Sequence, residues 1–375
     1  MTGPGVVVSG STAIPVRNLW LLMLYASRLY QTSELLRGRG VEDNPDDLFD
    51  LISEVLVTAV ERRLQRTLGR QYRTASATLS RVRGRIDVLA TESKVLLAQG
   101  RVACRFDELS VDNLCNRVLR TALVVAGRRV ADPSLERHAA SLVDVLTQYG
   151  VSPTAVGVRD ARQLLPGRNQ RDDVEAIDAA RLLLEMEVPA EHHGLAVRRD
   201  PDRDVVLIRR LYEAAVRGFY RAVLPPQWTV SVGEMHQHWP VTEATDGLKA
   251  LLPIMKVDMR LQTIGRRIIV ETKFAEALEA NRYGGQRLSR DYLFQLYAYV
   301  QSQHGRDDLS TTAEGVLLYP TVSEHVDESA TIQGHRYRFL TVDLTANARD
   351  IRAALLSVPY SGQPAGATAI FTDTQ

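Results

Sequence analysis

The chain has 375 residues, 45% of them hydrophobic, which is enough apolar material for one large domain or two smaller ones. Its 46 basic and 45 acidic residues leave a formal net charge of +1, which excludes a globally basic nucleic-acid binder but leaves a local basic surface open. The two cysteines, Cys104 and Cys115, argue against a disulfide framework and against a zinc cluster of CxxC pairs, and they favour a reducing compartment.

The first apolar run of the chain covers residues 19–26 and lies between Arg17 and Arg28. It is far shorter than the roughly 17 residues that a helix needs to cross a bilayer. We therefore expect a soluble, cytoplasmic protein without a membrane segment.

The amino-terminal half is predicted to be mixed and largely helical. Residues 1–13 are rich in glycine and small side chains, lack periodicity, and are expected to be disordered. Asn18 is predicted to cap a helix whose apolar residues from 19 to 29 follow the spacing of a buried stripe. Further helices are predicted over 47–68, 111–126, 135–149 and 172–186, and strands over 83–90 and 102–106. The stretch 14–200 is interpreted as one amino-terminal domain that ends in a linker at 189–201.

Two groups of polar residues stand out in this half. Arginines concentrate at 62, 63, 66, 70, 73, 81, 83 and 85. Phosphate binding is one interpretation of this cluster. The alternative is a solvated helix end, which we favour by about two to one over phosphate binding. Asn113 and Asn116 lie on a predicted helix and are expected to form a polar network rather than to bind a ligand.

Residues 253–274 are unusual because charged residues occur inside two predicted strands. From Val257 onward apolar and charged residues alternate, and Asp258 lies on the charged face. In the second strand, over 267–273, Glu271 and Lys273 are two residues apart and project from the same face.

A two-residue turn at 264–265 would join these strands and pair Thr263 with Arg266. The same register sets Asp258 opposite Glu271. Two opposed carboxylates destabilise an ordinary sheet, and burial makes the repulsion worse. A divalent cation removes this conflict.

The charged residues therefore predict a metal site. Mg²⁺ is usually held by one or two carboxylates, together with waters and substrate phosphate oxygens, and Asp258 and Glu271 fit that demand. Lys273 is predicted to orient a water or to offset charge on the phosphate. Only four of the 46 basic residues are lysine, so a lysine at this position is a specific choice that arginine would not replace.

The residues that follow the hairpin extend this site. In a helix predicted over 290–303, Gln295 and Tyr299 are four residues apart and share a face. Residues 315–319 form a short apolar run suited to a buried parallel strand. Glu213, on a helix predicted from residue 205, is a candidate third carboxylate, although an exposed helix glutamate is the preferred interpretation. Residues 361–375 are expected to be a flexible tail.

The pattern D-x12-E-x-K formed by Asp258, Glu271 and Lys273 resembles the core of the PD-(D/E)xK nucleases. A solvated hairpin with incidental charges is the alternative for these residues taken alone. The Q-x-x-x-Y pair of Gln295 and Tyr299 resembles the extra motif of RecB-like nucleases in that superfamily, where the pair packs beside the metals.

Several segments, in the same order, also resemble the McrC family, the nuclease subunits of McrBC-type methylcytosine restriction systems. They are IPVRNLWLLMLYA at 14–26, GRIDVLAT at 84–91, FDELSVDNLCNRVL at 106–119, the hairpin, the Q-x-x-x-Y helix and GVLLYP at 315–320. The resemblance implies a cytoplasmic, Mg²⁺-dependent endonuclease that cuts double-stranded DNA in phage defence together with a ring-forming AAA+ GTPase. The amino-terminal half would engage the ring, and the carboxy-terminal half would cut. We expect the contact with the ring over residues 14–29 and the neighbouring elements to about residue 123, with Arg17, Trp20 and Tyr25 of the first helix among the contacts.

We therefore predict an α/β protein with a partner-binding domain over 14–200 and a PD-(D/E)xK restriction-endonuclease-like core over 201–360. The chain contains no P-loop of the form GxxxxGK[S/T], so nucleotide hydrolysis must come from another protein. Two other functions remain open. One is a non-catalytic adaptor that activates a GTPase ring, and the other is a self-sufficient nuclease of a different defence or repair system.

Overall fold

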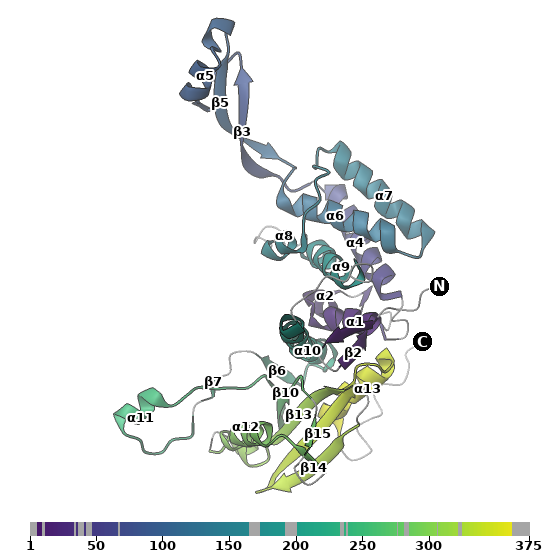
Figure 1. Cartoon of the computed structure of the whole chain (residues 1–375), viewed down its shortest axis with the longest axis vertical. Helices are drawn as coiled ribbons and strands as arrows, with labels where there is room; N and C mark the ends of the chain where they lie inside the picture. The colour runs from purple at the N-terminus through teal and green to yellow at the C-terminus, as the bar shows by residue number, and fades with distance from the viewer. Residues whose placement is uncertain are drawn as a thin grey trace. The chain divides into compact units, whose positions relative to one another are not determined.

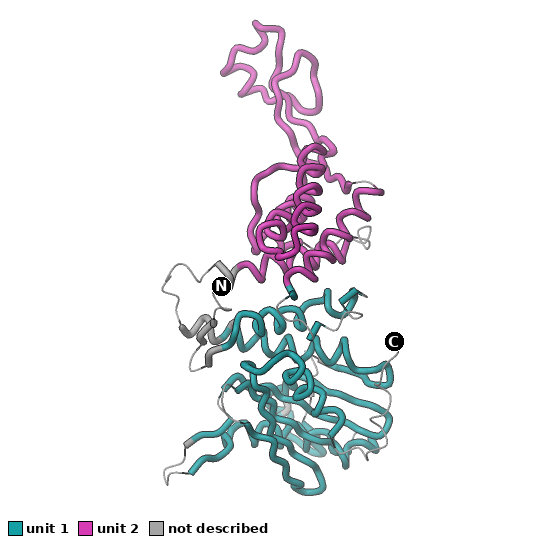
Figure 2. The backbone as a smooth tube through the Cα atoms, turned by 90° about the vertical axis from the view of Figure 1, so that its right-hand side faces the viewer, with its two compact units in different colours: residues 1–48, 189–375 teal, residues 49–188 magenta. Residues whose placement is uncertain are grey.

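A computed structural model describes residues 6–9, 12–33, 35–36, 41–42, 47–66, 68–164, 173–191, 201–232, 236–237, 239–275, 277–280, 285–305, 307–321 and 325–361. The chain divides into two compact units, which Figure 2 colours separately. Unit 1 combines Met1–Leu48 with Pro189–Gln375, and unit 2 is Phe49–Val188. No described helix combines the length and apolar character that a bilayer crossing requires.

Unit 2 is built from helices and one small sheet. Its helices are α4 (Leu48–Arg66), α5 (Val88–Ser93), η2 (Leu97–Gln99), α6 (Leu114–Arg129), α7 (Pro133–Gln148), α8 (Val158–Gln163) and α9 (Val174–Glu191). Its strands, in the sheet order β3-β5-β4, are β3 (Gln71–Leu79), β5 (Val102–Ser110) and β4 (Arg85–Ile86).

Strands β3 and β5 form a long antiparallel ribbon that extends away from α6 and α7 and carries α5 near its far end (Figure 1). We call residues 71–110 the arm. The prediction of a strand over 83–90 was wrong beyond Ile86, because the Asp87 side chain accepts a hydrogen bond from the Ala90 N–H and starts α5 instead. Strand β3 was not predicted.

The two asparagines at the base of the arm form the polar network that was predicted. Asn113 caps α6 by accepting from the Asn116 N–H. Both amide groups donate to the Gly69 carbonyl, and buried Arg63 donates to the Asn116 carbonyl at 3.0 Å. The burial of Arg63 removes it from any phosphate-binding surface.

Unit 1 contains a six-stranded mixed sheet with helices packed on it. The strands of unit 1, including those outside this sheet, are β1 (Val6–Ser9), β2 (Thr12–Pro15), β6 (Thr229–Val232), β7 (His236–Gln237), β8 (Met255–Lys256), β9 (Met259–Thr263), β10 (Arg266–Thr272), β11 (Leu278–Ala280), β12 (Gln286–Leu288), β13 (Glu314–Thr321), β14 (Asp327–Ile332) and β15 (His335–Asp343). Its helices are α1 (Val16–Ala26), α2 (Arg28–Thr32), α10 (Pro201–Val223), α11 (Asp246–Leu251), α12 (Arg290–Gln301), η4 (Asp308–Thr311) and α13 (Ala348–Tyr360).

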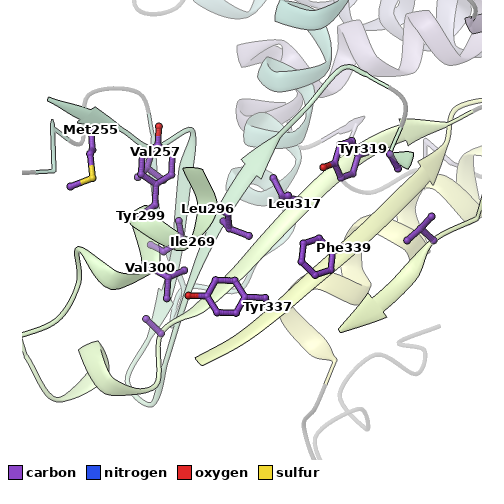
Figure 3. Close-up of a cluster of buried hydrophobic side chains, with 13 residues drawn as sticks. Met255, Val257, Ile269, Leu296, Tyr299, Val300, Leu317, Tyr319, Tyr337 and Phe339 are labelled. Atoms are coloured by element: carbon purple, nitrogen blue, oxygen red, sulfur yellow. The ribbon is translucent and has the colours of Figure 1, made fainter. Parts of the chain in front are cut away.

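The sheet has the order β14-β15-β13-β10-β9-β6, in which β10, β13 and β15 are parallel neighbours and the remaining pairs are antiparallel. Helix α12 connects β10 to β13 and packs on one face of the sheet, where Ile269, Leu317, Leu296 and Val300 belong to one buried cluster (Figure 3). Gly315 permits this contact, since a Cβ there would lie 2.9 Å from Val300 Cγ2.

Helix α1 is an integral part of unit 1. A Cβ at Gly218 of α10 would lie 1.8 Å from the Tyr25 carbonyl oxygen, so only glycine permits the close approach of α1 and α10. Asn18 does not cap α1 as predicted. It is fully buried, and its amide donates to the Leu344 and Ala346 carbonyls at 2.7 and 2.9 Å. These contacts place the first helix in the same unit as the sheet, so the compact units differ from the predicted division near residue 200.

A buried carboxylate supports the same packing. Glu42 accepts hydrogen bonds from the Tyr25 and Tyr30 hydroxyls at 2.8 and 3.3 Å, and Arg352 of α13 pairs with it at 3.2 Å. Tyr25 is therefore fully buried and cannot contact a partner as predicted.

The predicted disorder of residues 1–13 was also wrong in part. Val6–Ser9 and Thr12–Pro15 pair as antiparallel strands, and the β-branched valines of the first strand favour that conformation. The predicted tail beyond residue 361, and most of the predicted linker at 189–201, lie outside the described residues.

Candidate active site

The site lies where β9 begins and β10 ends. The ladder between these strands runs from Thr263↔Arg266 to Met259↔Val270, which confirms the predicted turn. Asp258 lies one position beyond this ladder, in a bend. Its carboxylate turns toward the next residue of β10 and accepts from the Thr272 N–H and hydroxyl, both at 2.9 Å to Oδ2.

The other predicted residues form a continuous chain of contacts. Lys273 Nζ donates to Glu271 Oε1 and to Gln295 Oε1, each at 2.7 Å. Gln295 Nε2 in turn donates to the Tyr299 hydroxyl at 2.7 Å. Because Gln295 and Tyr299 lie one turn apart on α12, that helix holds the lysine against the end of β10. The structure thus brings all five predicted residues to one place.

Two of the three charged side chains of this site, those of Glu271 and Lys273, are buried, and Asp258 is partly buried. Glu271 is 3% exposed and Lys273 is 6% exposed. Burial, followed by the negative charge of Asp258, raises the pKa of Glu271 from 4.5 to about 7, although Lys273 acts in the opposite direction. Burial also raises the pKa of Tyr299.

One carboxylate oxygen of Glu271 is a buried hydrogen-bond acceptor without a full hydrogen bond. Oε1 accepts from Lys273, whereas no donor from the described part of the chain makes a full hydrogen bond to buried Oε2, although the backbone N–H of Asp258 lies close enough to the Glu271 carboxylate to lower its pKa slightly. A buried carboxylate oxygen without a partner is costly unless a ligand reaches it.

This donor set fits Mg²⁺. The cation prefers oxygen ligands and needs only one or two carboxylates when waters and phosphates complete its shell. Asp258 and Glu271 supply two carboxylates, which are close enough for the charge of Asp258 to raise the pKa of Glu271. The described residues contain no cluster of three or more His, Cys, Asp or Glu, so a site closed by protein ligands alone is absent from them.

Glu213 does not join the group. It pairs with Arg217 one turn along α10 at 2.7 Å, which agrees with the preferred interpretation of a helix-surface glutamate. Sequence reasoning missed two neighbours of the site. Tyr292 places its ring 4.9 Å from Lys273 Nζ, and Thr272 binds Asp258. Tyr292 lies one turn before Gln295, a spacing that could have indicated it.

The model of the McrBC 5-methylcytosine restriction system component family matches residues 10–320. The chain belongs to this family. It is 24% identical over 346 residues to the Type IV methyl-directed restriction enzyme EcoKMcrBC of Escherichia coli (strain K12), across 92% of this chain and 97% of that protein.

Two solved structures from Thermococcus gammatolerans are also similar. One is a half-complex from a tetradecameric assembly of McrB AAA+ hexamers with bound McrC, with 15% identity, a TM-score of 0.45, and coverage of 92% of this chain and 76% of that chain. The other is a McrBC complex, with 16% identity, a TM-score of 0.35, and coverage of 50% and 60%.

Proposed function

We propose that this McrBC-family chain is the Mg²⁺-dependent DNA endonuclease subunit of a modification-dependent restriction system that acts in the cytoplasm. It would cut double-stranded DNA in complex with a AAA+ GTPase that it stimulates. The observation that carries this proposal is the buried Glu271–Lys273 pair, in which Glu271 Oε2 receives no full hydrogen bond, the charge of Asp258 acts on the Glu271 carboxyl, and Gln295 fixes the lysine.

The order of elements around the site supports a PD-(D/E)xK core. An antiparallel hairpin of β9 and β10 carries the acidic residues, α12 crosses over one face, and β13 returns parallel to β10. Parallel strands end at the same edge of a sheet, so this connection brings the ends of β10 and β13 together beside α12.

Each residue then has a chemical role in phosphodiester hydrolysis. Bound Mg²⁺ would polarise a phosphate oxygen and lower the pKa of a water. Asp258 and Glu271 would hold the ion. Lys273, kept in place by Glu271 and Gln295, offers a fixed positive charge to the phosphate as negative charge develops on it.

Two features of the chain support a GTPase partner, namely the lack of a nucleotide-binding motif and the exposed apolar surface of the arm. It has no P-loop, and its net charge of +1 provides no broad excess of cations for DNA. A translocating partner would supply that affinity. The arm carries a set of exposed apolar side chains, and such surfaces mark interaction sites. These residues are Tyr72, Val82, Ile86, Val88, Leu89, Val95, Leu97 and Leu109.

We therefore assign the contact with the GTPase to the arm, in place of helix α1. Of the three α1 residues expected at this contact, Tyr25 is buried, and Arg17 and Trp20 are only partly exposed. On the arm, by contrast, Leu89 is 81% exposed and Tyr72 is 74% exposed.

The exposed arm alone would equally suit a non-catalytic adaptor. The candidate site argues against that function, since a buried carboxylate with an orphan oxygen costs stability and an adaptor gains nothing from it. The test is reconstitution of the purified chain with a candidate AAA+ GTPase partner, with GTP, Mg²⁺ and modified DNA. We expect cleavage only with both proteins. Cleavage by this chain alone, independent of GTP, would support a self-sufficient nuclease instead.

A further inference from the structure

The residue between the two charged positions of the E-T-K triplet holds the first carboxylate of the site. Thr272 is 6% exposed and donates twice to Asp258 Oδ2, through its N–H and through its hydroxyl. Both bonds end on the same oxygen, so Oδ1 stays available to another ligand.

The strand pattern explains why this contact exists. Neighbouring N–H groups along β10 point to opposite sides, and the Lys273 N–H donates to the Leu318 carbonyl of β13 at 3.1 Å. The Thr272 N–H therefore points toward β9. Because β9 begins only at Met259, its backbone offers no ladder partner there, and the Asp258 side chain takes that place.

The Thr272 hydroxyl restricts the rotation of the Asp258 carboxylate more than the backbone hydrogen bond alone does. An aspartate carboxylate rotates freely about its last torsion, and one N–H leaves much of that freedom. A second donor on the same oxygen, from a β-branched side chain with a restricted rotamer, fixes the plane of the carboxylate. Groups that orient metal ligands in this way typically change metal affinity or activity about 10- to 100-fold when removed.

We propose that Thr272 is a positioning residue that orients Asp258 Oδ1 toward the divalent cation. The inference rests on the proposed function, because it assumes that Asp258 binds a metal. It requires a hydroxyl at position 272 and does not depend on the size of the side chain. Serine should therefore replace threonine, whereas valine, which has nearly the same shape and also favours strands, should not.

The chain offers a matched control in Thr341 of β15, which is also 6% exposed and whose hydroxyl accepts from the Val326 N–H at 2.8 Å. Thr341→Val removes a buried strand hydroxyl that is bonded to Val326 and not to Asp258. Any general effect of such a loss on folding should appear in both valine variants, and an effect on metal binding should appear only in Thr272→Val.

The experiment measures Mn²⁺ binding to the full-length protein by electron paramagnetic resonance, for the wild type and for Thr272→Val, Thr272→Ser, Thr341→Val and Asp258→Asn. We expect Thr272→Val to weaken binding about 10-fold or more, with Thr272→Ser and Thr341→Val close to wild type. Unchanged binding in Asp258→Asn would overturn the metal site itself and with it the proposed function. Binding lost in Asp258→Asn but unchanged in Thr272→Val, or equally weak in Thr272→Ser, would overturn only the role of Thr272.

Discussion

At the scale of single residues, the site is defined by what each buried group is bonded to. Lys273 is held by Glu271, Gln295 and the ring of Tyr292, so its ammonium has a fixed position. A guanidinium is larger, planar and always charged, so it does not simply replace an ammonium that is held by these three partners. The use of lysine in a chain that otherwise prefers arginine therefore has a structural reason.

Gln295 should matter for activity without being essential. Gln295→Ala removes one of the two hydrogen bonds that hold Lys273, so we expect cleavage to slow on the order of 10- to 100-fold. Tyr299→Phe, which keeps the ring and removes only the hydroxyl beside Gln295, should have a smaller effect. Normal cleavage by Gln295→Ala, together with loss of folding in Tyr299→Phe, would show that the pair serves only core packing.

The raised pKa of Glu271 makes the metal-free protein sensitive to pH. In the folded state the Glu271 carboxyl keeps its proton up to about pH 7, whereas in the unfolded chain the same carboxyl releases its proton near pH 4.5. The folded state therefore binds more protons between these values, and the free energy of unfolding falls as pH rises through that window, by at most about 1.4 kcal/mol per pH unit.

The Glu271→Gln variant lacks this contribution. Urea unfolding in the presence of a chelator should show that the wild type loses more stability than Glu271→Gln between pH 5 and pH 8. Parallel curves for the two proteins over this range would contradict the assigned pKa.

At the scale of elements, the arm should couple this chain to its partner. The double variant Leu89→Ser, Leu97→Ser replaces two exposed side chains, so its melting temperature should stay close to that of the wild type. Its stimulation of GTP hydrolysis should fall about 10-fold or more, because losing two apolar contacts with the partner costs more than about 1.4 kcal/mol of binding free energy. The matched control is Leu251→Ser, which changes an equally exposed leucine (79%) on α11 of unit 1. Equal effects of the two changes on GTP turnover would rule out a specific role for the arm.

Elements with strong local signals could be predicted from the sequence. The turn that pairs Thr263 with Arg266, helix α12 and strand β13 follow from periodicity and turn chemistry over a few residues. Strand β3 could not be predicted, because its sequence QYRTASATL is mostly polar and both of its faces are largely exposed. The core of the site was predicted for the same local reason, since Glu271 and Lys273 lie two residues apart at the end of β10.

At the scale of the whole molecule, the division into units depends on distant contacts that no local pattern shows. Asn18 bonds to Leu344, 326 residues away, and Gly218 accommodates the backbone of Tyr25. Thr272 was missed for a related reason, since alternation predicts that it faces away from Glu271 and does not show that β9 begins only at Met259.

These contacts predict how the chain can be divided. A fragment of residues 189–375 would lose α1 and expose the apolar face of α10, so we expect it to lack cooperative thermal unfolding. Supplying residues 1–48 in the same chain through a short linker should restore the transition. A cooperative transition in the fragment alone would show that α1 is dispensable for folding of this unit.

In the proposed function, one chain both activates the GTPase and carries the nuclease site. The most direct measurement compares wild type with Asp258→Ala, each reconstituted with the AAA+ GTPase, Mg²⁺, GTP and modified DNA, and follows GTP turnover and DNA cleavage in the same sample. We predict that Asp258→Ala stimulates GTP hydrolysis as well as the wild type does and cuts no DNA. Cleavage by Asp258→Ala at the wild-type rate would contradict the claim.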